Sequence, residues 1–177
     1  MGVVLKMSFN IRNKDSLDVR DTKMPVELVK AFYDLQIHSI LDIGCGSGWI
    51  CDYMPPSTFY VGFDKEPRAI QNAKKLHPEG HFIETTIENF PQDFEKHFSF
   101  ASFDCAFLKC MFCTVPKELF PKMVEIITKY VKKYVFLYDT EKEPNIWFNL
   151  FTEAGLTLEF THLRQSSHVQ IWSFRHG

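Results

Sequence analysis

The sequence predicts an α/β fold in three layers, with helices on both faces of a seven-stranded, mostly parallel sheet. Seven short apolar segments, rich in β-branched and aromatic residues, are expected to be strands. Most of them alternate with segments of helical periodicity, the order found where parallel strands are joined by right-handed crossovers. The last two strands flank the polar segment 165–167, which predicts an antiparallel hairpin that closes the sheet.

The first expected elements surround a glycine-rich turn. Segment 22–35 is expected to be a helix, because Pro25 suits an early helical position and the apolar residues fall on one side. The apolar run 39–43 is the first strand. Residues 49–53 can then open a helix, which the pair Pro55-Pro56 stops. The elements expected next are strand 57–64, helix 67–76 and strand 80–86.

The second half of the chain continues the alternation. Segment 121–131 is amphipathic; its lysine-rich side is taken as a solvated face, with an acidic partner as the alternative. Helix 144–154 is stopped by Gly155. His162 and His168 flank the hairpin turn and are expected at the surface. The remaining expected strands are 102–109, 134–138, 157–164 and 169–175.

Length and composition predict a single domain with an aromatic core. A chain of 177 residues suffices for a single domain with a sizeable core. We divide it into a lead-in or lid, residues 1–24, and one domain, residues 25–177. Residues 1–24 mix charges without periodicity, so a disordered tail is the alternative for them. The 18 phenylalanines predict a Phe-rich core rather than an apolar substrate pocket.

Several classes of partner and location are disfavoured. A net charge of −2 argues against nucleic-acid binding driven by charge alone. No apolar run approaches the ~20 residues of a membrane span. The N-terminus lacks the cleavage pattern of a signal peptide. An odd number of cysteines, five, predicts reduced thiols and a cytoplasmic location.

The stretch Leu41–Gly48, LDIGCGSG, is the most informative part of the sequence. A buried strand followed by glycines at every second position indicates a sharp turn that something approaches closely. Such a turn offers bare backbone N–H groups to a ligand. Dinucleotide enzymes use G-x-G-x-x-G, whereas the spacing here is G-x-G-x-G, followed by Trp49. The spacing therefore disfavours a nicotinamide dinucleotide oxidoreductase.

Two acids accompany this turn. Asp42 lies two residues before the first glycine, where a carboxylate disfavours a pyrophosphate and suits a ligand carrying an ammonium and a sulfonium. Asp64 ends the next expected strand, 20 residues after Gly44. An acid at that spacing hydrogen-bonds ribose hydroxyls. Capping of the following helix is the alternative role of Asp64.

The acid, the glycine spacing and the preceding apolar strand closely resemble motif I of the class I S-adenosylmethionine-dependent methyltransferases, of the small, single-domain type. The resemblance extends from about residue 25 to the end, but only the glycine turn and Asp64 are specific motifs. It implies a Rossmann-like sheet and S-adenosylmethionine as cofactor. The cofactor-binding residues that it implies are Asp42, Gly44, Cys45, Gly46, Asp64, Lys65, Thr86, Ile87 and Leu108.

The resemblance also suggests individual roles. Thr86 stands where many members carry Asp, and its hydroxyl, with the backbone N–H of Ile87, would contact adenine. Carbonyls near Phe107 and Leu108 are candidates to accept the methionine ammonium. Phe90 is expected in the core rather than stacked on adenine.

Catalytic residues are less clearly indicated. Lys109, Cys110 and Tyr138 follow or end strands whose tips border the expected site, and they are the candidates to act on the acceptor. Cys113 and Thr114 stand where many members carry Glu and His, so no ready general base is present. The pair Cys110-x-x-Cys113 lacks a second CxxC or a nearby His pair, so no metal is expected.

The expected function is methyl transfer from S-adenosylmethionine to a nucleophile on a small-molecule acceptor. The sequence shows no large insertion that would recognise a macromolecule, and it lacks the Asn-Pro-Pro-Tyr pattern of nucleobase amino methylation. Two alternatives stay open beside the disfavoured oxidoreductase. One is a non-catalytic cofactor-binding subunit that regulates or stabilises a partner protein; the other is a methyltransferase acting on a protein or nucleic acid.

Overall fold

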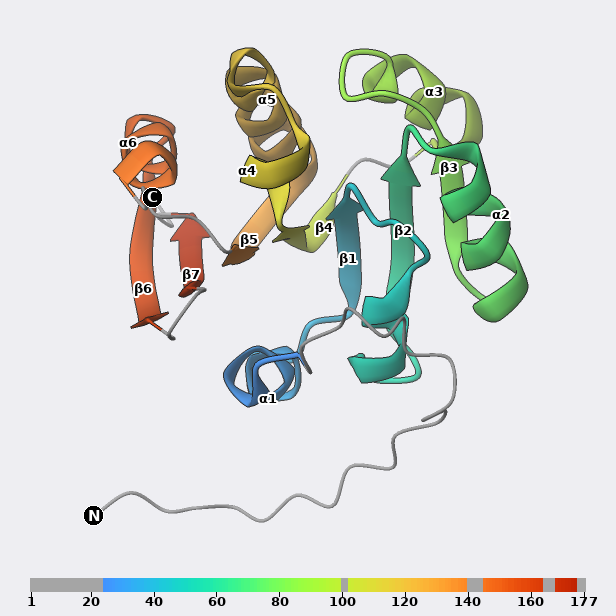
Figure 1. Ribbon diagram of the computed structural model, residues 1–177. Helices are drawn as coiled ribbons and strands as arrows, with labels where there is room; N and C mark the ends of the chain where they lie inside the picture. Colours follow the sequence, from blue (N-terminus) through green and yellow to red (C-terminus); the bar gives the residue numbers. More distant parts are fainter. Residues whose placement is uncertain (1–23, 100–101, 140–144, 164–167, 175–177) are drawn as a thin grey trace.

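A computed structural model describes residues 24–99, 102–139, 145–163 and 168–174 of the chain. Within these ranges it forms one seven-stranded sheet in the order β3-β2-β1-β4-β5-β7-β6 (Figure 1). The strands are β1 (Ser39–Ile43), β2 (Phe59–Asp64), β3 (His81–Glu84), β4 (Phe103–Lys109), β5 (Val131–Asp139), β6 (Leu156–Leu163) and β7 (His168–Phe174). Strands β1 to β5 are parallel, and β7 runs antiparallel to β5 and β6. The predicted mostly parallel sheet with a closing hairpin is confirmed.

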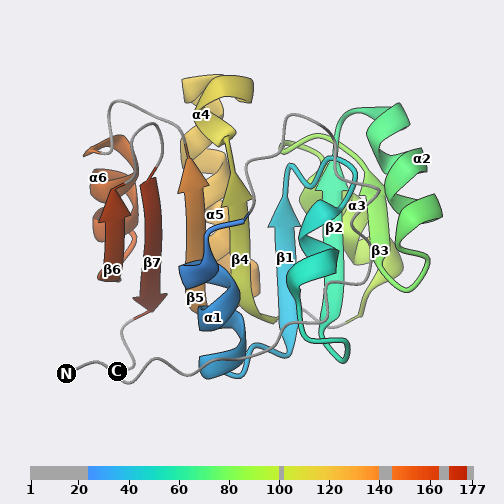
Figure 2. The ribbon, with the colours of Figure 1, turned by 60° about the horizontal axis from the view of Figure 1, so that its bottom comes forward.

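Helices cover both faces of this sheet. The helices are α1 (Val26–Asp34), the 3₁₀ helix η1 (Trp49–Tyr53), α2 (Pro67–Leu76), α3 (Phe90–His97), α4 (Met111–Thr114), the 3₁₀ helix η2 (Lys117–Leu119), α5 (Phe120–Tyr130) and α6 (Asn145–Glu153). One core cluster joins α1, η1 and α2 to one face, and a second joins α3, α5 and α6 to the other. Figures 1 and 2 show α1 on the opposite side of the sheet from α5 and α6. The three predicted layers are therefore present.

The parallel strands are buried on both faces, so their sequences are nearly continuous apolar runs. Leu41 and Ile43 pack with α3 and α5, whereas Ile40 packs with α1. The largest fully buried side chains are aromatic, which agrees with the predicted Phe-rich core. Phe90 is fully buried and stacks on Phe63 with ring centroids 4.1 Å apart, which confirms its expected place in the core.

Several elements differ from those predicted, and the short helices α4 and η2 were not predicted at all. Helix α3 was not predicted, although Phe90 and Phe94 are spaced i, i+4 and bury one face. The helix expected after Gly48 is only a 3₁₀ segment, because Pro55 and Pro56 follow so closely. Strand β5 begins at Val131 rather than at residue 134, since α5 passes into it without a loop.

Parts of the predicted organisation lie outside the described residues. Of the lead-in, residues 1–24, only Met24 is described, and it is buried in the α1 cluster. The polar turn 165–167 is likewise outside the described residues. Among the helices that are described, none has the length and apolar character needed to cross a bilayer.

Gly62 of β2 pairs with Asp42 of β1 in the parallel ladder, and the side chains of Tyr60 and Cys45 approach it closely. A Cβ atom on Gly62 would lie 2.5 Å from the hydroxyl oxygen of Tyr60, 2.8 Å from the Cβ of Cys45 and 2.9 Å from its Sγ. These distances are too short for a side chain. Gly62 therefore makes room for the turn after β1 to fold back over β2.

We expect Gly62→Ala to lower the free energy of unfolding by about 1–3 kcal/mol, because the added methyl group overpacks this site. Urea denaturation of the wild type and the variant measures the difference. Ser57→Ala, a change at an exposed position before β2, is the control and should stay within about 0.5 kcal/mol. Equal stability of Gly62→Ala and wild type would contradict the close packing described here.

Candidate functional site

The carboxyl ends of β1 and β4 lie side by side at the point where the strand order reverses. In open α/β sheets this topological switch point is where ligands bind. The turn Gly44–Gly48 follows β1 at this edge, and Asp64 ends the neighbouring strand β2. The fold thus brings together the two specific motifs of the sequence.

The backbone N–H groups at the start of the turn are bound to β2. Those of Gly44 and Cys45 both donate to the carbonyl of Phe63, at 2.9 and 3.0 Å. That of Gly46 donates to Oδ2 of Asp64 at 2.9 Å. The prediction that the turn presents bare N–H groups is therefore wrong for these three residues. Their hydrogen bonds instead hold the turn against the end of β2.

The glycines of the turn meet different surroundings. A Cβ on Gly44 would lie 3.1 Å from Sδ of Met111, and one on Gly48 would lie 2.8 Å from the ring of Phe82. A Cβ on Gly46 would meet no atom within 4 Å. Gly46 also has a φ of +54°, in the left-handed region that favours glycine. It is therefore the point where a ligand can lie directly against the backbone.

Asp64 is half-buried and uses both carboxylate oxygens within the chain. Oδ2 accepts from Gly46, and Oδ1 accepts from the N–H of Glu66 at 3.0 Å. Helix α2 is capped by Glu66, whose own side chain accepts from the N–H of Arg68 at 3.4 Å. A carboxylate offers about four acceptor sites. Two therefore stay available to hydroxyl groups of a ligand.

Asp42 is buried beneath the turn, with an exposed fraction of 3%. Burial raises the pKa of its carboxyl from the usual 3.8 to about 7; the hydrogen bond from Tyr60 opposes this shift, as does the charge of Lys109, while Asp64 adds to it. The Tyr60 hydroxyl donates to Oδ2 of Asp42 at 2.7 Å. The neighbouring Cys45 is also buried, and burial raises the pKa of its thiol. A cation placed near Asp42 would favour the ionised form of this carboxyl.

The other predicted cofactor residues lie around this centre. Lys65 is exposed beside Asp64. Thr86 is half-buried beyond β3, where its hydroxyl accepts weakly from the N–H of Asn89 at 3.4 Å. Ile87 and Leu108 are buried, and Leu108 pairs within β4 between β1 and β5. Their contacts with a cofactor stay predictions.

The three catalytic candidates lie together at the ends of β4 and β5. With Trp49, they form what we call the rim of the site. Nζ of Lys109 lies 3.8 Å from the ring centroid of Trp49, a cation–π contact. The N–H of Cys110 donates to the carbonyl of Tyr138 at 2.9 Å, and Lys109 pairs with Tyr138 in the ladder. Cys110 adopts a left-handed φ of +53°, which turns the chain into α4. Tyr138 is buried, so Lys109 and Cys110 are the more accessible candidates.

Sequence reasoning missed residues that shape the site from below. Tyr60 binds Asp42, Trp49 lies against Lys109, and Met111 lies against Gly44. The sequence signal for Tyr60 was its position two residues before Gly62 in a predicted strand. That its partner is Asp42 follows only from the strand register. His168, expected at the surface, is buried and lies opposite the equally buried Asp139 in the β5–β7 ladder.

The residues described by the structure include no group of three His, Cys, Asp or Glu side chains that could hold a metal ion. The side chain of Cys113, the second cysteine of the Cys110-x-x-Cys113 pattern, lies outside the described residues. Among the described side chains, those of Cys45, Cys51 and Cys105 are free thiols.

Known structures share this fold at low sequence identity. A magnesium protoporphyrin IX methyltransferase from Synechocystis PCC 6803, solved with bound S-adenosylmethionine, aligns with a TM-score of 0.64 and 13% identity over 85% of this chain and 77% of that one. A TehB-like methyltransferase from Corynebacterium glutamicum aligns with a TM-score of 0.63 and 15% identity over 84% and 87%. A ribosomal protein L11 methylase from Lactobacillus delbrueckii subsp. bulgaricus gives 0.66 and 10% over 85% and 78%. These likenesses establish the fold.

The fold and the motif at its switch point are those of class I S-adenosylmethionine-dependent methyltransferases. A family model described as a methyltransferase domain matches residues 37–159, more than half of the sequence, and the chain belongs to this family. The cofactor of the family is S-adenosylmethionine. A comparison with curated proteins found no match.

The raised pKa of Asp42 predicts a specific pH dependence of stability. Between about pH 4 and pH 7 the folded protein holds a proton that the unfolded chain releases, so stability falls as pH rises through this window. We expect Asp42→Asn to remove this loss and to raise the free energy of unfolding at about pH 8, by on the order of 2–4 kcal/mol. Urea denaturation at a series of pH values measures it. A variant that tracks the wild type at every pH would contradict the shift.

We expect Asp64→Ala to weaken S-adenosylmethionine binding by about 1–3 kcal/mol, because carboxylate hydrogen bonds are lost and the anchor of Gly46 is removed. Isothermal titration calorimetry measures the affinity. Glu153→Ala removes an exposed acid at the end of α6 and is the control, with affinity unchanged within about twofold. Equal losses in the two variants would rule out a specific role for Asp64.

Proposed function

We propose that this chain transfers the methyl group of S-adenosylmethionine to a nucleophile on a small-molecule acceptor, in the cytoplasm. The observation that carries the proposal is the open space at Gly46, where an added Cβ would meet no atom. Asp64, which binds the N–H of Gly46, has unused acceptor sites, and the buried Asp42 lies in the strand that leads into the turn. The residues present therefore fit a nucleoside that carries positive charge.

Each of the two acids has a distinct part in holding this cofactor. The remaining acceptor sites of Asp64 suit the ribose hydroxyls. Asp42 faces the positively charged methionine end, and a cation there offsets the cost of ionising a buried carboxyl. Thr86 and Ile87 are proposed to contact adenine, and the carbonyl of Leu108 to accept from the methionine ammonium.

When bound, the cofactor supplies a methyl group that its positive sulfur already activates. The task left to the protein is to hold the acceptor in line with that methyl, which can lower the barrier by up to about 7–11 kcal/mol. Lys109 and Cys110 are half-buried at the rim and are proposed to position the acceptor. The ring of Trp49 fixes the Lys109 ammonium and gives the rim an aromatic side.

The charges of the chain favour a small acceptor over a nucleic acid. A net charge of −2 gives no broad attraction for phosphates. The rim instead carries the Lys109 ammonium and the Trp49 ring, which suit a small acceptor with an acidic or planar group.

A non-catalytic cofactor-binding subunit is the second candidate function. The hydroxyl of Thr114 donates to the carbonyl of Cys110 at 3.1 Å, so it is engaged within α4 rather than directed at an acceptor as a base. Catalysis then depends on acceptors whose nucleophile is already deprotonated or has a low pKa. Without such an acceptor the chain would only bind the cofactor.

The decisive experiment supplies labelled-methyl S-adenosylmethionine and a fractionated metabolite extract to the purified chain. We expect label in one or a few small-molecule fractions, and none with Gly46→Val, whose side chain fills the opening. Calorimetry with S-adenosylmethionine and with NAD identifies the cofactor that is bound. If S-adenosylmethionine binds but no fraction is labelled, with or without cellular proteins, the non-catalytic function is correct instead.

A further inference from the structure

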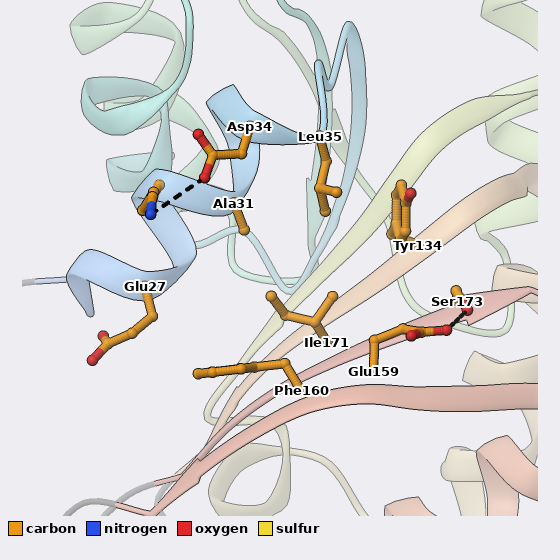
Figure 3. A pocket seen from close by; sticks show the side chains of 10 residues that line it. Glu27, Ala31, Asp34, Leu35, Tyr134, Glu159, Phe160, Ile171 and Ser173 are labelled. Carbon is orange, nitrogen blue, oxygen red and sulfur yellow. Dashed lines mark hydrogen bonds and ion pairs between the residues drawn. The ribbon is translucent and has the colours of Figure 1, made fainter. Parts of the chain in front are cut away.

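A groove of about 640 Å³ lies on the α1 face of the sheet, between α1 and the hairpin β6–β7 (Figure 3). Its described lining contains no residue of the glycine turn or of the rim at Lys109. The lining residues are Glu27, Lys30, Ala31, Asp34, Leu35, Tyr134, Glu159, Phe160, Ile171 and Ser173. The groove is thus separate from the proposed cofactor site.

The walls of this groove are mainly apolar. Ala31 and Leu35 line it from the helix side, and Phe160 and Ile171 line it from the strands (Figure 3). Phe160 has an exposed fraction of 37%, which is unusual for a large apolar side chain of this protein. A volume of this size lies within the range of about 300–1,000 Å³ found for small-molecule sites, which are also mostly apolar.

Two of the three acids in the lining are bound by other residues of the lining. Asp34 pairs with Lys30, whose Nζ lies 3.6 Å from Oδ2 of the acid. Glu159 accepts a hydrogen bond from the hydroxyl of Ser173. Figure 3 shows this pair on the opposite side of the groove from Glu27. These contacts reduce what either acid can offer to a ligand.

The third acid, Glu27, has an unmet need for a donor. Its Oε2 is buried and has no hydrogen-bond partner among the described residues. Its Oε1 lies 4.0 Å from Nε2 of His162, which is beyond hydrogen-bond distance. A buried acceptor without a donor destabilises a protein. The side chain as a whole is 28% exposed and lines the groove, so a positively charged N–H donor of a ligand can reach this carboxylate and offset the cost.

We infer that the groove binds a small organic ammonium ion with an apolar, aromatic body. The ammonium lies at Glu27, and the body packs against Phe160 and Ile171. The acids outnumber the single lysine of the lining, so an anionic ligand of the same shape is repelled. Because the groove is remote from the glycine turn, this binding is independent of cofactor binding and of the proposed methyl transfer.

The test uses 2-phenylethylamine as probe, with 2-phenylethanol as its neutral analogue and 3-phenylpropanoate as an anionic one. Calorimetry or NMR titration should give an affinity about tenfold higher for the amine than for the alcohol, since a charge-assisted hydrogen bond is added. The anion should bind least. Glu27→Gln keeps the shape of the side chain and should abolish the preference for the amine.

Asp34→Asn is the matched control, because it removes an acid of the same helix that is already paired with Lys30. It should change amine affinity by less than about twofold. An unchanged affinity of each variant for S-adenosylmethionine shows that folding is intact. The inference is overturned if amine and alcohol bind equally, if Glu27→Gln has no effect, or if only a lysine-bearing peptide binds, since the groove would then be a protein-docking surface.

Discussion

The hydrogen bond from the N–H of Gly46 to the carboxylate of Asp64 is the interaction on which the candidate site depends. It joins the turn after β1 to the end of β2 at 2.9 Å, and the bonds from Gly44 and Cys45 to Phe63 hold the same junction. The turn is thereby shaped before any ligand arrives. Such preorganisation reduces the ordering cost that binding would otherwise incur.

The same junction holds a carboxyl group in a place that disfavours its charge. Asp42 is buried beside Tyr60 and near Asp64, and burial raises its pKa to about 7. This burial makes the ionised form of the carboxyl costly when no cation is near. Retention of a costly acid under a turn that can receive a cation follows the general pattern in which binding sites give up stability for function.

The face of the sheet that carries α1 is used differently along its width. Over β1 and β4, η1 and α1 cover the face, and the rim residues Trp49 and Lys109 close the edge above it. Over β6 and β7 the helix α1 stands off from the strands, and Phe160 stays partly exposed in the groove (Figure 3). The cofactor edge and this groove are therefore separate places on one rigid sheet, each with its own acid.

The sequence by itself determined the order of the seven strands, the sharp turn at Gly44–Gly48 and the acid that ends β2, because periodicity, glycine spacing and strand-end residues are local properties. Only the tertiary structure decided that Tyr60 bonds Asp42, that Met111 covers Gly44 while Gly46 stays open, and that His168 is buried opposite Asp139. Each of these contacts joins residues from different elements, or follows from which face of a strand a side chain occupies. Register and packing set such contacts, and no short stretch of sequence encodes them alone.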